Sequence, residues 1–463
     1  MKMKKMMALV LSAALALTTF CVPLMADEAE ASDVVEVTDD TMAGEDDLNG
    51  IVTYDVRLAS AAVCTETKPA EPKLTVTYIS GSSGIFVTKE VDPSNYEVTF
   101  SNNNVPGMAT AHIQGKNGYS DLNRDFFFKV RGFYSVYGND RYETAVRLAK
   151  DSHDGLAVKK MIIADGKKFP DALAASVLVD EETVMVMSST KSLNRFVKEA
   201  IQNVWTLDKI IVVGGAFEAQ FFSDLNALGY AKDGGKLLQL AGNDRYETAL
   251  KVAAYAHESK NYNYDICAVA TGKAPYDAMS FSTSAAYGGI PIYLVGGSGT
   301  ANAATQAAIN QYKYVVILGG DAVVKDSVVS GRLKRSAEEV LTETGPENSY
   351  CRIGGNDRYQ TSQLLLEALE DSSWTSDGAI MAHGGQSHWP DALVAGNYGF
   401  GNLAPVLLVN SGNTGATTYL ANKLSGTLSV NPNPYTNFLL PGFAGIGTEA
   451  KVIKDQITIQ DMN

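Results

Sequence analysis

The stretch Gly138-Asn139-Asp140-Arg141-Tyr142-Glu143-Thr144-Ala145 occurs three times in this chain with small changes. Its second copy runs from Gly242 to Ala249, and its third copy runs from Gly355 to Ser362 with glutamine in place of the glutamate. The aspartates of successive copies are 104 and 113 residues apart. A period of this length is too long for a solenoid repeat, and each copy is long enough to fold as a domain. The sequence therefore predicts three similar modules in tandem.

Within the first copy, predicted helices alternate with predicted strands. Residues 140–150 have the apolar spacing of a helix, and helices are also expected over residues 171–179 and 193–204. Short apolar strands are expected between them, at residues 161–164, 184–187 and 210–213. Strands that are apolar on both faces and alternate with helices indicate a parallel sheet with helices on both sides. The predicted fold class is α/β, with modules at residues 133–232, 236–343 and 349–463.

A second motif follows each copy of the first, and it reads Phe169-Pro-Asp-Ala-Leu173, Pro275-Tyr-Asp-Ala-Met279 and Trp389-Pro-Asp-Ala-Leu393. Its aspartate comes a few residues after a strand and begins a helix. This is the carboxyl edge of the sheet, where open α/β folds place their ligands. Further apolar strands end in Gly214-Gly215 and Gly319-Gly320, which would allow close approach of the backbone; the third copy has Pro441-Gly442 instead.

The arginine of the first motif is not explained by local structure. Asp140 as helix cap and Glu143 three residues later form a capping-box arrangement. A positive charge in the first helical turn opposes the helix dipole, so the arginine needs a specific partner. That partner is either the second-motif aspartate of the same copy, Asp277 for Arg245, or an anionic or hydroxyl-rich ligand. The candidate ligand-binding residues are Asp140, Arg141, Tyr142, Asp171, Asp244, Arg245, Tyr246, Asp277, Asp357, Arg358, Tyr359 and Asp391.

These motifs, in this order and repeated three times, resemble the cell-wall-binding repeat type 2 family of Gram-positive bacteria. The resemblance covers residues 133–463. It implies three α/β modules around a pseudo-threefold axis. It also implies non-covalent attachment to an anionic wall polymer, such as a teichoic acid or a similar polysaccharide. In that family the repeats anchor the protein, and a separate domain carries the variable function.

The residues before the repeats fall into three parts. A basic start, an apolar run and small residues over positions 1–26 are typical of a secretory signal peptide. Residues 27–49 hold ten acidic and no basic side chains, which predicts a solvated disordered linker. Residues 50–131 contain short alternating strands separated by turns, which favours a β-sandwich. Part of this last segment, residues 95–119, resembles bacterial Ig-like surface domains.

Composition narrows the class of function. The net charge is −14, so the chain has no basic field to attract nucleic acid. Beyond the signal, no stretch is apolar enough to span a membrane, and three remaining cysteines are too few for a disulfide framework. We find no catalytic motif, and we expect no cofactor and no metal site. His383 and His388 are the only histidines that lie close together in the sequence.

The sequence thus predicts a secreted, non-enzymatic protein of the cell wall or cell surface. Its predicted partner is an anionic wall polysaccharide or teichoic-acid-like polymer, and the Ig-like module would be displayed. Two alternatives stay open. In one, the chain is a wall hydrolase such as an amidase, or a modifier of one, and the repeats only target it. In the other, it is an adhesin that acts through the Ig-like module.

Overall fold

The computed structural model describes residues 51–409 and 437–441, apart from residues 60–61, 65–68, 83–84, 105–106, 261, 263, 373–377, 386–388 and 400–405. The predicted signal peptide and acidic linker lie outside the described residues. The chain divides into two compact units. Among the described residues, the first unit contains residues 51–55, 76–97 and 114–122, and the second contains the rest.

An antiparallel β region precedes the repeats, as the alternating sequence predicted. Strands β1 (Ile51–Leu58), β3 (Leu74–Ser82) and β4 (Ile85–Glu90) form a sheet in the order β1-β3-β4. Strands β3 and β4 are antiparallel, with Thr77 opposite Glu90. The 3-10 helix η2 (Pro93–Asn95) leads into the remaining strands of this region, β5 (Tyr96–Ser101), β6 (Gly107–Gly115) and β7 (Asn123–Val136). The likeness of this region to an Ig domain stays a prediction.

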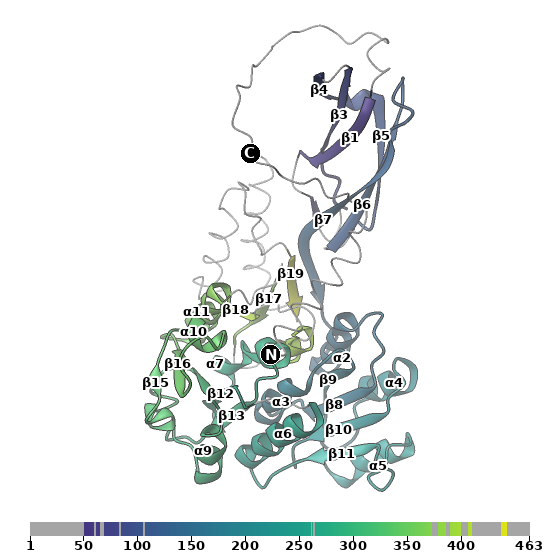
Figure 1. The fold of residues 1–463 in the computed structure, drawn as a ribbon. Helices are drawn as coiled ribbons and strands as arrows, with labels where there is room; N and C mark the ends of the chain where they lie inside the picture. The colour runs from purple at the N-terminus through teal and green to yellow at the C-terminus, as the bar shows by residue number, and fades with distance from the viewer. Residues whose placement is uncertain are drawn as a thin grey trace. The chain divides into compact units, whose positions relative to one another are not determined.

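The repeats form three parallel sheets, which confirms the predicted α/β class (Figure 1). The first sheet has the order β11-β10-β8-β9, from β8 (Lys160–Asp165), β9 (Thr183–Ser188), β10 (Lys209–Val213) and β11 (Leu237–Leu240). The second has the order β13-β12-β14-β16-β15, from β12 (Ile266–Thr271), β13 (Ile292–Val295), β14 (Tyr314–Leu318), β15 (Leu333–Lys334) and β16 (Ser349–Ile353). The third parallel sheet is formed by β17 (Gly378–His383), β18 (Val406–Val409) and β19 (Asn437–Pro441) with β7, and it continues into the preceding β region in the order β18-β17-β19-β7-β6-β5.

Each sheet is completed by the strand that precedes the next copy of the first motif. Strand β11 ends two residues before Gly242, and it pairs with β10 of the first sheet. Strand β16 precedes Gly355 in the same way and pairs with β14 of the second sheet. Strand β7 precedes Gly138 and pairs in parallel with β19 of the third sheet, which also receives the short strand β2 (Val63–Cys64) on β7. The three modules are therefore interlocked in a closed cycle, because the first repeat supplies the strand that the last one lacks.

Helices cover these sheets, and those of the first repeat include the helices predicted over residues 140–150, 171–179 and 193–204. In the first repeat they are α2 (Arg141–Ser152), α3 (Phe169–Ala175), η3 (Ser176–Leu178), α4 (Arg195–Asn203) and α5 (Ala219–Ala227). In the second they are α6 (Arg245–Lys260), α7 (Tyr276–Met279), α8 (Ser282–Gly288), α9 (Ala303–Ile309), η4 (Asp326–Val329) and α10 (Ala337–Leu341). In the third they are α11 (Arg358–Asp371), α12 (Trp389–Val394) and η5 (Ala395–Tyr398). None of the described helices has both the length and the apolar composition of a membrane span.

The second-motif helices of all three modules meet in one hydrophobic core. Helix α8 packs against both η3 and η5. The alanines that follow the motif aspartates, Ala172, Ala278 and Ala392, are at most 1% exposed and belong to a single buried cluster. Small side chains at this point let the three helices approach closely, which explains the Asp-Ala pair in each copy.

A buried amide also joins the third module to the first. The Asn397 side chain accepts a hydrogen bond from the Met185 amide (2.7 Å) and donates one to the Met185 carbonyl (2.8 Å). Met185 lies in the edge strand β9, so these two bonds pair backbone groups that would otherwise be buried without partners. The described cysteines are free and buried: Cys64, Cys267 and Cys351. The stability of the described chain therefore comes from its hydrophobic cores and not from disulfides between these cysteines.

Candidate functional site

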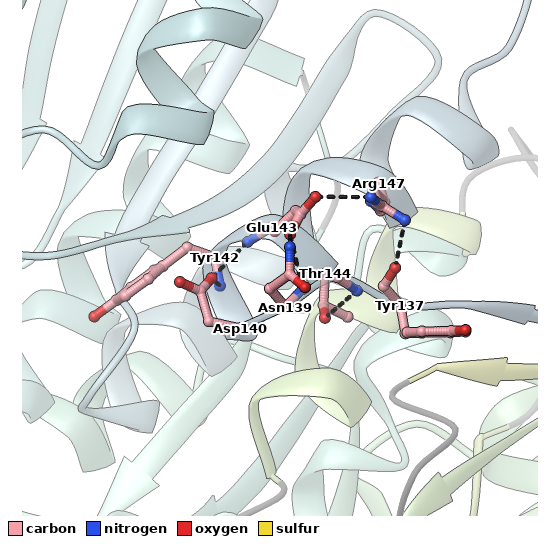
Figure 2. A network of polar contacts seen from close by, with 8 residues as sticks. Tyr137, Asn139, Asp140, Tyr142, Glu143, Thr144 and Arg147 are labelled. Atoms are coloured by element: carbon pink, nitrogen blue, oxygen red, sulfur yellow. Dashed lines mark hydrogen bonds and ion pairs between the residues drawn. The ribbon is translucent and has the colours of Figure 1, made fainter.

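The first motif builds a complete helix cap in each module. In the first copy, Asp140 Oδ1 accepts hydrogen bonds from the amides of Tyr142 and Glu143, both at 2.9 Å. The Gly138 amide donates to Thr144 Oγ1 (3.0 Å), and the Asn139 amide donates to Glu143 Oε2 (2.7 Å) (Figure 2). Every polar residue of the motif except the arginine and the tyrosine is therefore used in capping.

The other two copies repeat these bonds. The Gly242 and Gly355 amides donate to Thr248 and Thr361, each at 3.0 Å. One detail differs from the expected capping box: the glutamate or glutamine receives the amide of the asparagine before the cap, as in Asn243 to Glu247 at 2.8 Å. A side chain at the first glycine of the motif, Gly138, Gly242 or Gly355, would collide with the residue five positions later. That residue is Glu143, Glu247 or Gln360. The glycine is therefore required for the cap to close.

The arginine and the tyrosine of the motif both contact a glycine that the sequence analysis missed. Arg141 Nη1 donates to the Gly166 carbonyl at 2.8 Å, and Arg358 Nη1 donates to the Gly384 carbonyl at 2.9 Å. Arg245 makes the same bond to Gly272. A Cβ at any of these glycines would collide with the ring of the motif tyrosine: Tyr142, Tyr246 or Tyr359. The sequence could have revealed these glycines, because a glycine directly follows the first strand of every repeat.

The second-motif aspartates lie near the arginine of the next module rather than near that of their own, so the pairing of Arg245 with Asp277, one of the two predicted alternatives, is wrong. Burial raises the pKa of Asp171, and the positive charge of Arg245 partly opposes this shift. Burial likewise raises the pKa of Asp277, which lies near Thr361 and Arg358. Burial raises the pKa of Asp391 to about 6, with Arg141 opposing. Each arginine is therefore near the aspartate of the module before it in the cycle.

The diglycines allow this arrangement, as the sequence suggested. Gly214 and Gly319 have φ of +111° and +105°, in the region that favours glycine. A Cβ at Gly214 would lie 2.5 Å from Asp171 Oδ2, and one at Gly319 would lie 2.8 Å from Asp277 Oδ2. Their lack of a side chain lets the carboxyl group lie against the backbone at the strand end. Gly442 of the third copy lies outside the described residues.

The three interfaces differ in what lies over the arginine. The Arg358 guanidinium is 3.3 Å from the centre of the Tyr276 ring, and the Arg141 guanidinium is 5.9 Å from that of Trp389. Both arginines are half-buried, whereas Arg245 is exposed. Among the described residues, no aromatic ring lies over Arg245. At the interface between modules 1 and 2, where Arg245 lies, the residue that corresponds to Tyr276 is Pro170.

A cavity opens at this first interface, between modules 1 and 2. Its volume is about 270 Å³, and both second-motif and first-motif residues line it. The lining residues are Lys168, Pro170, Asp171, Gly215, Ala216, Gly242, Asn243, Asp244, Arg245 and Thr248. The cavity thus gathers three of the predicted site residues from two modules, Asp171, Asp244 and Arg245, and adds Lys168, which the sequence analysis did not single out.

The described residues offer binding chemistry. The cavity has two cations, two carboxyl groups and an amide, which suit a polar ligand. Across the described part of the chain, no cluster of three or more histidine, cysteine or acidic side chains is arranged to hold a metal. His383 Nδ1 accepts a hydrogen bond from the Gly385 amide at 2.8 Å, and His388 lies outside the described residues.

Comparisons with known proteins support the division of the chain into three repeats. The family model of cell wall binding domain 2 (CWB2) matches residues 136–218, 239–329 and 352–456. The structure is similar to that of Cwp8 from Clostridium difficile, with a TM-score of 0.56 and 20% identity, covering 79% of this chain and 64% of that one. It is also similar to Cwp6 from Clostridium difficile, with a TM-score of 0.54 and 14% identity, covering 86% of this chain and 68% of that one. A search of curated proteins found no match.

Proposed function

This chain belongs to the cell wall binding domain 2 family, and we propose that it is a surface protein held on the Gram-positive wall by its three repeats. In this proposal the repeats bind an anionic wall polymer, a teichoic-acid-like chain or another acidic polysaccharide, without a covalent bond. The protein is exported by the signal at residues 1–26, and the linker at 27–49 precedes the β region at 50–131. The β region is displayed at the surface.

The observation that carries this proposal is the threefold use of one motif at the interfaces between modules. Family membership covers all three repeats, and each repeat places an arginine beside the second-motif aspartate of its neighbour. Three related interfaces on one body permit simultaneous contacts with a repeating polymer, which raises the overall affinity even when the single contacts differ in strength. The ligand contacts are assigned to the twelve predicted residues, with Arg245 the most accessible of the arginines.

Sedimentation of the full chain with purified walls tests the proposal. Walls are used intact and after chemical extraction of their anionic polymers. The protein is expected to sediment with intact walls and to stay in the supernatant with extracted walls. Equal sedimentation with both would contradict polymer binding, and no sedimentation with either would contradict wall anchoring.

We propose no catalytic role for the chain. The sequence has no recognised catalytic motif, and the binding chemistry of the described interfaces needs none. Zymography on wall peptidoglycan checks this directly. A cleared band at the mass of this chain would favour the hydrolase alternative, in which the repeats only bring the enzyme to its substrate.

A further inference from the structure

The three interfaces between modules are built from the same parts but are not equivalent. At the second interface, between modules 2 and 3, the Tyr276 ring lies against Arg358. At the third interface, between modules 3 and 1, the Trp389 ring lies near Arg141. At the first interface Phe169, which corresponds to Trp389, packs edge to face on Trp389 itself, with ring centres 6.3 Å apart. Its ring is therefore engaged with the third module, and Pro170 is too short to cover Arg245. The cavity is the space that results.

The first interface also carries a cation that the second lacks. Lys168 lines the cavity and is exposed, whereas the corresponding residue of the second repeat is Ala274. Both Lys168 and Arg245 lie near enough to Asp171 to lower its pKa, but neither forms an ion pair with it among the described contacts. Only one nitrogen of Arg245 has a hydrogen-bond partner in the described structure, the Gly272 carbonyl. Two positive groups thus flank one cavity with donors to spare.

The cap at the start of helix α6 uses backbone amides at the edge of the cavity. Asp244 caps this helix by accepting the Glu247 amide at 2.8 Å, and Thr248 Oγ1 accepts the Gly242 amide at 3.0 Å. With these two amides occupied, the side chains of Lys168 and Arg245 supply the positive charge of the cavity lining. Asn243 and Asp244 are exposed beside them and offer partners for hydroxyl groups.

We propose that this cavity is the principal ligand site and holds one anionic sugar unit of the wall polymer. The anionic group lies between Lys168 and Arg245, and the sugar hydroxyls face Asn243 and Asp244. A volume of about 270 Å³ is slightly below the range of pockets for drug-sized ligands, which suits a single charged monosaccharide. The inference rests on the proposed wall-binding function and assigns it mainly to one of the three interfaces.

Two substitutions make the first interface resemble the second. Lys168→Ala introduces the residue of the second repeat, and Pro170→Tyr introduces the ring that covers the arginine there. Lys167→Ala is the matched control, because Lys167 is an exposed neighbour outside the cavity lining. Affinity of the full chain for intact walls is measured for the wild type and the three variants, and melting curves report on folding.

We expect Lys168→Ala and Pro170→Tyr to weaken wall binding by about tenfold or more, as for loss of a charged hydrogen bond, and Lys167→Ala to stay within about twofold. If the wild type binds walls and Lys168→Ala binds equally well, the assignment to this cavity is overturned while wall anchoring stands. If the wild type does not bind, the proposed function itself fails. Since Lys168 is exposed, its variant tests the site even if Pro170→Tyr does not fold.

Competition by small sugars identifies the ligand chemistry. Glucose 1-phosphate, glucuronate and glucose are added to wild-type protein bound to walls. Competition by glucose 1-phosphate or by glucuronate, with glucose inactive, is expected and distinguishes a phosphate from a carboxylate ligand. Equal competition by glucose would overturn an anionic ligand in favour of a neutral sugar.

Discussion

At the scale of single residues, the motif threonine is an informative test of the helix cap. Thr248→Val keeps the side-chain shape but leaves the Gly242 amide without its acceptor. We expect a loss of about 1–3 kcal/mol in the free energy of unfolding, because a partly buried donor loses its partner. Urea unfolding of the full chain measures this.

Thr305→Val is the matched control for this substitution. Thr305 is 1% exposed, and its hydroxyl has no hydrogen-bond partner among the described residues. Its replacement should leave stability unchanged or raise it, because a buried hydroxyl without a partner is removed. Equal losses for both valine variants would show that the cap bond of Thr248 contributes nothing specific.

The buried aspartates make a second prediction at this scale, about pH. Burial raises the pKa of Asp391 to about 6, above its ordinary value of 3.8. The folded chain therefore binds a proton more tightly than the unfolded chain, so this group favours folding most below about pH 4. Its contribution falls as pH rises from about 4 to about 6, by about 3 kcal/mol in total.

Asp391→Asn should remove this dependence. The difference in unfolding free energy between variant and wild type should shift in favour of the variant as pH rises from 4 to 7. The pKa values of Asp171 and Asp277 are raised in the same direction. The stability of both proteins, wild type and variant, therefore keeps some dependence on pH from these two groups. Parallel stability curves for the two proteins would contradict the shifted pKa of Asp391.

At the scale of elements, the strands that cross between modules are the feature that makes one body of three repeats. Strand β7 closes the cycle by pairing with β19, with Tyr134 opposite Leu439 and Ser135 opposite Leu440. Successive residues of a strand direct their amides to opposite sides, so one of these two amides faces β19. Proline at that position removes a ladder hydrogen bond.

We expect at least one of Tyr134→Pro and Ser135→Pro to lower the free energy of unfolding by about 1–3 kcal/mol relative to alanine at the same position. Hydrogen exchange should rise in β17 and β18 more than in β8, because the third sheet loses its closing strand. If both proline variants match their alanine controls in stability and exchange, β7 does not hold the third module.

The elements themselves were predictable, but their exchange between modules was not. Apolar runs such as residues 161–164 and 210–213 indicate buried strands, and Asp140 with Glu143 indicates the start of a helix. The run Leu237–Leu240 has the same character whichever sheet it joins, so the sequence did not show that β11 completes the first sheet. For the same reason Arg245 was paired with Asp277 of its own copy, when the chain path brings it to Asp171.

At the scale of the whole molecule, the acidic character of the chain constrains how it holds an anionic polymer. The net charge is −14, so long-range attraction is absent and binding depends on local cations. The cavity at the first interface provides two of them, Lys168 and Arg245. The shared core and the crossing strands fix this cavity between two modules, so its geometry depends on the assembly of both.

The dependence of wall binding on salt is the most direct test of the claim that local cations hold an anionic polymer. The fraction of full chain bound to intact walls is measured as sodium chloride rises from 0.05 M to about 0.5 M, with and without a chelator of divalent cations. Because salt screens contacts between exposed charges, we predict that binding weakens steadily with salt and does not need the chelated ions. Binding that is unchanged by both salt and chelator would contradict the claim and indicate recognition of neutral sugars, and binding that is lost with chelator alone would show that divalent cations bridge protein and polymer.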